Sequence, residues 1–134
     1  MNGGERIDRN SPVGRRWETV ITAAQKYRLE DWNAMRLWRI EDGRLLSDKI
    51  EGPMIYVALG HQVCQYIGKS RRTIQERLTE HLLEEPKSRT WSHMGCIVLK
   101  PIVPVNEVAN LERKAIDIMR PRMNGDKPRY REAG

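Results

Sequence analysis

The sequence lacks the features typical of zinc-bound, secreted and membrane-spanning proteins. It has only two cysteines, Cys64 and Cys96, and three histidines, with no CxxC pair and no zinc-finger spacing. Each cysteine lies within an apolar run, so we expect buried free thiols in a reducing compartment rather than a disulfide. The first residues include no apolar stretch typical of a signal peptide, and no apolar run approaches about 18 residues. We therefore expect a cytoplasmic protein with no membrane partner.

The charge of the chain points to a polyanionic partner. The length of 134 residues suggests one domain, and 31% of the residues are charged, with a net charge of +6 at pH 7. A basic balance of this size favours nucleic acid first and an acidic membrane surface second. The alternative is that the charge only keeps the protein soluble.

Residues 1–50 are expected to form an N-terminal extension. Residues 1–14 are rich in glycine, proline and polar side chains, which predicts a disordered start. Apolar residues recur at helical spacing over residues 15–36, and Asp31 is a plausible cap for a second, short helix within that range. The Asp-Gly pair at residues 42 and 43 predicts a turn between two short strands.

Residues 51–126 are expected to form the main domain, followed by a basic tail over residues 127–134. The segments "MIYVAL" and "VCQYI", joined by "GHQ", predict a β-hairpin. A capping box at Thr73 and Glu76 then predicts a helix, and "MGCIVL" predicts a third strand. Asn106 is expected to cap a last helix. This order predicts an α+β (mixed α/β) fold in which a small three-stranded antiparallel sheet is flanked by helices.

One carboxylate in the last expected helix breaks its amphipathic pattern. Glu112 falls within the apolar arc, one turn from Val108 and one turn from Ile116. Burial of an unpaired carboxylate costs several kcal/mol, so Glu112 needs a cation, a hydrogen-bonding network or an edge open to water. The alternative is a paired or snorkelling glutamate with a structural role.

Two further pairs of polar residues lie beside expected apolar surfaces. Arg77 and His81 are four residues apart on the flank of the first helix after the hairpin, where they can grip a phosphate. Tyr56 and Tyr66 lie on adjacent strands, so their side chains can share one face of the sheet. A phenol is a poor base unless its pKa near 10 is lowered. Either pair can also be purely structural.

These elements together resemble the GIY-YIG nuclease superfamily over residues 53–126. Met54-Ile55-Tyr56 stands at the first tripeptide of the family, with Met54 in place of glycine, and Tyr66-Ile67-Gly68 is the second tripeptide intact. The segment "GKSRRTIQERLTEHL" is similar to the part of the family that carries the catalytic arginine. The segment "NEVANLERKAIDIMRPRMN" is similar to the part that carries the metal-binding glutamate.

The resemblance implies a divalent-metal-dependent endonuclease that hydrolyses phosphodiester bonds in DNA. Glu112 would bind one Mg²⁺ (or Mn²⁺), and Tyr56 would accept the proton of the attacking water. Arg77 would stabilise the transition state, while His81 and Tyr66 would orient the reacting groups.

Other residues have supporting roles in this interpretation. Gly68 and Asn124 would support the site, and basic residues would contact the nucleic-acid backbone: Lys69, Arg71, Arg72, Arg120 and Arg122. Arg71 or Arg72 could also share the role of Arg77. RNA as substrate, a monomer or a homodimer, a catalytically inactive binding module on the same fold and a basic interaction domain all remain open.

Overall fold

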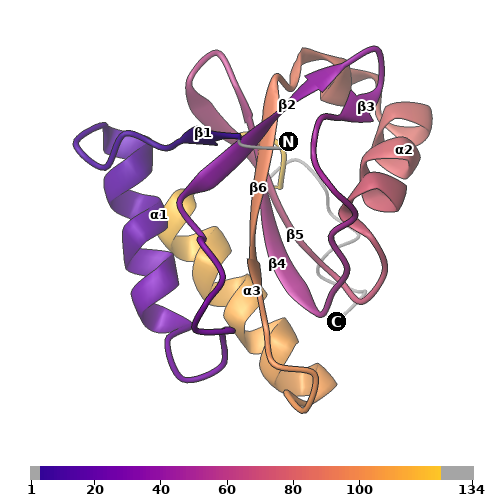
Figure 1. Cartoon of the computed structure of the whole chain (residues 1–134). Coiled ribbons are helices and arrows are strands. Elements are labelled where there is room, and N and C mark those ends of the chain that lie inside the picture. Colours follow the sequence, from indigo (N-terminus) through magenta and orange to yellow (C-terminus); the bar gives the residue numbers. More distant parts are fainter. Residues whose placement is uncertain (1–3, 125–134) are drawn as a thin grey trace.

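The computed structural model describes residues 4–124, which form three α-helices and a six-stranded antiparallel sheet (Figure 1). The strand order is β1-β2-β6-β4-β5, and β3 pairs with β2. The strands are β1 (Glu5–Arg6), β2 (Arg36–Glu41), β3 (Arg44–Leu45), β4 (Met54–Gly60), β5 (Val63–Ser70) and β6 (His93–Val98). The α+β class is confirmed. The expected sheet of three strands was too small, because the N-terminal extension adds β1, β2 and β3.

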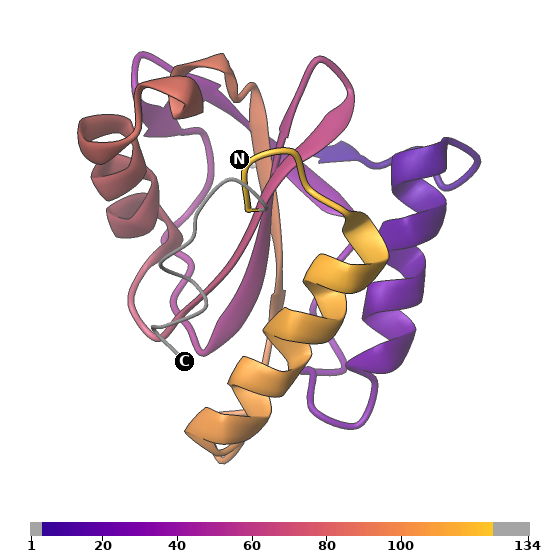
Figure 2. The ribbon, with the colours of Figure 1, turned by 180° about the vertical axis from the view of Figure 1, so that it is seen from behind.

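The helices cover both faces of the sheet (Figures 1 and 2). Helices α1 (Pro12–Ala23) and α3 (Val105–Met119) lie side by side on one face, and α2 (Ile74–Glu84) lies on the other. A short 3₁₀ helix, η1 (Pro86–Thr90), follows α2. Successive side chains of a strand point to opposite faces of the sheet. Because helices cover both faces, every residue of β4 is buried.

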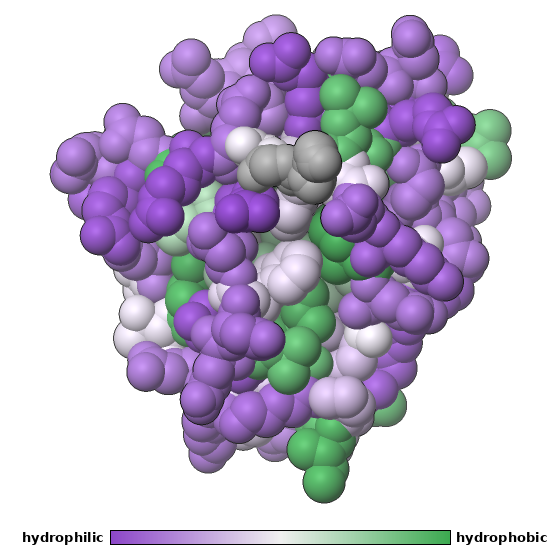
Figure 3. All heavy atoms as spheres, viewed as in Figure 1, coloured by the Kyte–Doolittle hydropathy of each residue, from purple (hydrophilic) through white to green (hydrophobic). Residues whose placement is uncertain are grey.

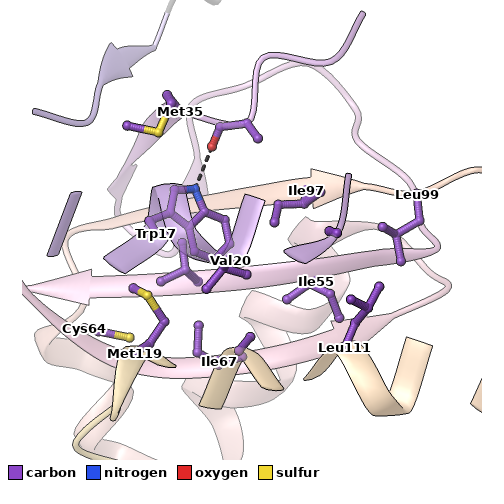
Figure 4. Close-up of a cluster of buried hydrophobic side chains, with 14 of the residues drawn as sticks. Trp17, Val20, Met35, Ile55, Cys64, Ile67, Ile97, Leu99, Leu111 and Met119 are labelled. Carbon is purple, nitrogen blue, oxygen red and sulfur yellow. Dashed lines mark hydrogen bonds between the residues drawn. The ribbon is translucent and has the colours of Figure 1, made fainter. Parts of the chain in front are cut away.

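The core under α1 and α3 is built around Trp17, whose side chain is fully buried (Figure 4). Its indole Nε1 donates a hydrogen bond of 2.7 Å to the carbonyl of Ala34. Ile55 and Ile67 of the hairpin and Leu111 of α3 belong to the same cluster. Residues of the extension therefore build the same core as the hairpin.

The predicted hairpin is confirmed. Strands β4 and β5 pair antiparallel, and His61 and Gln62 form the turn with φ values of 56° and 65°. Both central residues of this tight turn need a positive φ for the twist of the strands to match. The register shifts between Ala58 and Leu59.

The N-terminal extension differs most from the sequence-based expectation. The disordered start is wrong for residues 4–14, since β1 pairs with β2 and Ser11 caps α1. The second helix proposed at Asp31 does not form. Trp32 instead donates from Nε1 to the carbonyl of Cys96 at 2.9 Å, and this tertiary bond overrides the helical pattern. The predicted turn at residues 42 and 43 is confirmed between β2 and β3.

Local sequence signals predict the start of α2 but not the start of α3. The Thr73–Glu76 capping box is present in full at the start of α2. The expected cap at Asn106 was wrong, because α3 begins at Val105 with Pro104 at the N-cap. Proline suits a helix start because the first amide groups of a helix have no partner within the helix.

Both cysteines are buried free thiols, as predicted. Within residues 4–124 no helix is long and apolar enough to cross a bilayer. The expected basic tail at residues 127–134 lies outside the described residues.

Candidate active site

The hydroxyl of Tyr56 lies over Gly68, its cross-strand partner on β5. Tyr56 is completely buried in the middle of β4. A Cβ atom at Gly68 would lie 2.4 Å from both the hydroxyl oxygen and Cζ of Tyr56. No side chain fits in that space, so the absence of one at Gly68 allows the phenol ring to extend across β5.

Two residues of α2 contact the Tyr56 hydroxyl. His81 Nε2 lies 2.8 Å from it, and Arg77 donates from Nε at 3.3 Å. The two residues are one helical turn apart, so both reach the same point from one helix. The hydroxyl therefore has a proton acceptor or donor on one side and a cation on the other.

Arg77 keeps its positive charge beside the phenol. Burial lowers the pKa of Arg77, but contacts with Tyr56 and Glu80 outweigh this effect, and the pKa is raised above its usual value. Glu80 also forms ion pairs with Arg77 and Arg72. Arg72 is the main reason why the pKa of Glu80 is lowered. A guanidinium next to Tyr56 favours the phenolate form of that side chain.

Glu85 completes a chain of contacts that our sequence analysis missed. Its Oε1 lies 3.0 Å from His81 Nδ1, on the opposite side of the imidazole from Tyr56. The side chains of His81 and Glu85 are only 7% and 15% exposed. Glu85 follows His81 by four residues, a spacing that could have suggested the contact. A carboxylate on Nδ1 fixes the ring orientation and stabilises the imidazolium form.

Aromatic rings enclose the imidazole of His81. The ring of Tyr66 lies 4.6 Å from it and that of Trp91 lies 5.0 Å from it, centroid to centroid. Tyr56 and Tyr66 are 6.1 Å apart on the α2 face of the sheet, as the hairpin predicted. Trp91 had no role in the sequence analysis, because its proximity depends on the path of the chain after α2.

Glu112 lies on the other side of β5. Its Oε1 is 3.2 Å from the Nζ of Lys69, and the two side chains are 16% and 42% exposed. Lys69 follows Gly68 on β5, and neighbouring side chains on a strand point to opposite faces. Glu112 therefore has the cation that its place in the apolar arc required, and that cation is a lysine. Helix α3, which carries Glu112, therefore packs on one face of the sheet, whereas the Tyr56 side chain lies on the other, with α2.

The fit of a divalent cation to this site depends on Glu112 alone. No group of three or more histidine, cysteine, aspartate or glutamate side chains able to hold a metal occurs within residues 4–124. Mg²⁺ is often held by one or two carboxylates together with several waters. The partly exposed Glu112 suits such binding once Lys69 moves away.

Asn124 ties the end of α3 to the outer edge of β5. Its Oδ1 accepts from the amide of Ile67 and its Nδ2 donates to the carbonyl of the same residue, both at 2.8 Å. The amides of Arg122 and Met123 donate to the carbonyls of Cys64 and Gln65. The segment therefore fixes α3, and with it Glu112, against β5.

The basic residues do not form one cluster. Arg71 donates to the carbonyl of Val103 at 2.9 Å, whereas Arg72 pairs with Glu80 at 2.5 Å. Arg120 and Arg122 line a separate cavity near the hairpin turn. Among these arginines and Arg77, it is Arg77 whose contact with Tyr56 is observed, so geometry favours Arg77 over Arg71 or Arg72 at the phenol.

Comparisons with protein families, with curated proteins and with solved structures found no match.

Proposed function

We propose that the protein is a divalent-metal-dependent endonuclease of the GIY-YIG type that hydrolyses phosphodiester bonds in DNA. The main support is one observation: a buried phenol that extends over a glycine lies between an imidazole and a guanidinium. A purely structural tyrosine has no need of two charged or ionisable partners at its hydroxyl. This arrangement suits proton transfer next to a phosphate.

The proton of the attacking water passes to Tyr56 in this proposal. A phenol with a pKa near 10 is a weak base at pH 7. Arg77 compensates by favouring the phenolate, and His81 Nε2 takes the phenol proton as the water is deprotonated. Glu85 holds the imidazole in the orientation that this transfer needs. Arg77 and His81 of α2 and Glu85 at its C-cap therefore all promote proton transfer at the Tyr56 hydroxyl.

Arg77 has a second task at the phosphate. Its side chain is 26% exposed, so part of it remains open to a ligand. Negative charge on the phosphoryl oxygens grows in the transition state, and a pre-positioned cation stabilises it more than the ground state. Removal of such a group typically slows a reaction by about 100- to 1,000-fold.

Glu112 would hold the cation beside β5, the edge strand that separates it from Tyr56, and Lys69 would exchange its contact with Glu112 for one with the nucleic acid. A bound Mg²⁺ or Mn²⁺ supplies Lewis-acid stabilisation of a phosphate oxygen. Lys69, released from Glu112, would then be available for the phosphate backbone. Asn124 would keep α3 and β5 in register while this exchange occurs.

The test is cleavage of supercoiled plasmid with Mg²⁺, with Mn²⁺ and with EDTA. Wild type should nick the plasmid only with a metal, and Tyr56→Phe and Glu112→Gln should lose at least about 100-fold in rate. Tyr27→Phe is a matched control, because this phenol donates to Glu107 on α3, away from the site. It should cleave like wild type. Absence of cleavage by wild type, or equal nicking by all variants, would contradict the proposal.

The Lys69–Glu112 ion pair supports a second candidate, an inactive nucleic-acid-binding module. In that case the lysine would neutralise Glu112 permanently and no cation would be needed. Such a protein would bind DNA equally well with Mg²⁺ and with EDTA and would leave plasmid uncut. The Glu112→Gln variant would then retain full binding.

A further inference from the structure

A cavity of about 310 Å³ lies near the turn between β4 and β5, at the opposite end of β5 from Lys69. Three segments surround it: the first turns of α1, the start of β5 and the residues that follow α3. Its charged lining residues are three arginines, Arg16, Arg120 and Arg122, and no acidic residue of the described chain lines it. The cavity therefore has a strongly cationic rim.

The wall of the cavity is apolar. Val13, Val63 and Met119 contribute to it together with Cys64, and Figure 4 shows the Cys64 and Met119 side chains at the same end of the buried cluster. Burial raises the pKa of Cys64 to about 12, so its thiol is neutral at pH 7 and does not repel an anion. An apolar wall beside a cationic rim suits a ligand with one apolar part and one anionic part.

One residue of the lining has an unfavourable backbone conformation. Arg120 has a φ value of 49°, in the left-handed region where a Cβ atom is disfavoured. Glycine is the most frequent residue at a helix end with this conformation, yet Arg120 occupies it after α3. Strained residues cluster at ligand sites, where the side chain is needed in spite of the strain. The rim thus carries one long charged side chain where stability alone favours glycine.

A structural role for these arginines explains only part of the charge. Arg16 Nη1 donates to the carbonyl of Met119 at 3.5 Å, which partly compensates the end of α3. A helix end carries about half of one negative charge, whereas the rim carries three positive charges. The adjacent start of α1 adds a further partial positive charge. Most of the positive charge of the rim therefore has no counterpart in the helix ends.

We propose that this cavity binds one unpaired nucleotide of a nucleic-acid strand, with the phosphate on the arginines and the base against the apolar wall. The choice of a nucleic acid rests on the proposed function. Guanidinium groups bind phosphate with two parallel hydrogen bonds, and the apolar part of a ligand typically packs against the apolar side chains of a pocket. Cys64 and Gly68 are four residues apart on β5, about 13 Å. The cavity would hold the substrate at a fixed distance from the bond that is cut.

Binding of a fluorescein-labelled oligo(dT) of 12 nucleotides in EDTA tests the cavity without cleavage. Arg16→Gln and Arg122→Gln should each weaken binding about 3- to 10-fold and lower the salt dependence by about 0.7 per lost contact. Arg15→Gln is the matched control, since Arg15 is exposed on the same helix and does not line the cavity. It should change affinity less than twofold. Equal effects of Arg15→Gln and Arg16→Gln, or no effect of either cavity variant, would overturn the proposal.

Arg120→Gly separates binding from stability. Glycine relieves the left-handed strain, so the melting temperature should rise by a few degrees while oligonucleotide affinity falls. A rise in melting temperature with unchanged affinity would show that the arginine has no part in binding. Competition with thymidine monophosphate and with inorganic phosphate tests the base: the nucleotide should compete at about tenfold lower concentration. Equal potency would overturn the role of the apolar wall.

Plasmid cleavage by the same variants distinguishes this proposal from the nuclease proposal. If wild type fails to cut while Arg16→Gln loses oligonucleotide binding, the cavity is supported and the nuclease is not. If wild type cuts and every cavity variant binds and cuts like wild type, the cavity proposal fails alone.

Discussion

The imidazole of His81 has a contact at each of its two ring nitrogens. Its Nε2 contacts the Tyr56 hydroxyl at 2.8 Å and its Nδ1 contacts Glu85 at 3.0 Å. Glu85→Gln keeps the shape of the side chain and removes the charge that orients and stabilises the imidazolium. We expect the maximal cleavage rate to fall about 10- to 100-fold, with oligonucleotide affinity unchanged. Glu84→Gln, one residue earlier and exposed, should leave both quantities unchanged. A loss of affinity in place of rate would indicate a different role for Glu85.

At the scale of single residues, the sequence predicted which side chains lie together but not every contact that they make. Tyr56, Tyr66, Arg77 and His81 share one face because strand alternation and helical spacing act locally. Glu112 was recognised as a carboxylate in need of a cation, but Lys69 could not be assigned to it. That pair depends on how α3 crosses β5, which the Asn124 contacts with Ile67 help to fix.

Helix α2 is the element that positions both Arg77 and His81, and its start is stabilised by a charge. Glu76 Oε1 accepts from the backbone amide and the hydroxyl of Thr73, both at 2.9 Å. The backbone bond is the largest reason why the pKa of Glu76 is lowered from its usual 4.5. A lowered pKa in the folded state means that the stabilisation is present above pH 4.5 and is lost as the pH falls through the lowered value. Glu76→Ala should therefore reduce the urea midpoint at pH 7, with a smaller difference at pH 3.

The matched variant for this helix is Glu84→Ala, an exposed glutamate outside the capping box, which should lower the urea midpoint at pH 7 less than Glu76→Ala does. A Glu76→Ala difference that is equal at both pH values would contradict the role of the charge.

The sequence predicts the start of α2 correctly and the start of α3 wrongly, and both outcomes have one explanation. The capping box is a local signal complete within four residues. Pro104 and Asn106 both suit a helix start, and only the packing of α3 against β5 and α1 decides between them. β1 was missed because a two-residue strand exists only through its pairing with β2.

On the scale of the whole molecule, the extension and the hairpin form one sheet and one core. Strand β2 pairs with β6 through Trp38 and Met94, and β6 pairs with β4. Polar side chains cover most of the face seen in Figure 3, and apolar ones appear mainly in a strip down its middle. The sequence pattern changes near Gly52-Pro53 and therefore predicts two separate parts, residues 1–50 and residues 51–126. Composition does not record strand pairing between segments more than 50 residues apart.

Removal of residues 1–50 should therefore unfold the rest of the chain. Loss of α1 takes Trp17 and Val20 out of the core, and a buried tryptophan alone contributes about 3–5 kcal/mol. A domain of this kind has about 5–15 kcal/mol in total, and β6 would also lose its β2 neighbour and become an exposed edge that promotes aggregation. We expect the fragment 51–134 to show no cooperative urea transition in circular dichroism, whereas the full chain shows one. Full-length Trp17→Phe is the matched control: it keeps an aromatic ring, loses the bond to Ala34 and should still unfold cooperatively at a lower midpoint. A cooperative transition in the fragment would mean that the hairpin, α2, β6 and α3 form an independent unit and that the extension only covers it.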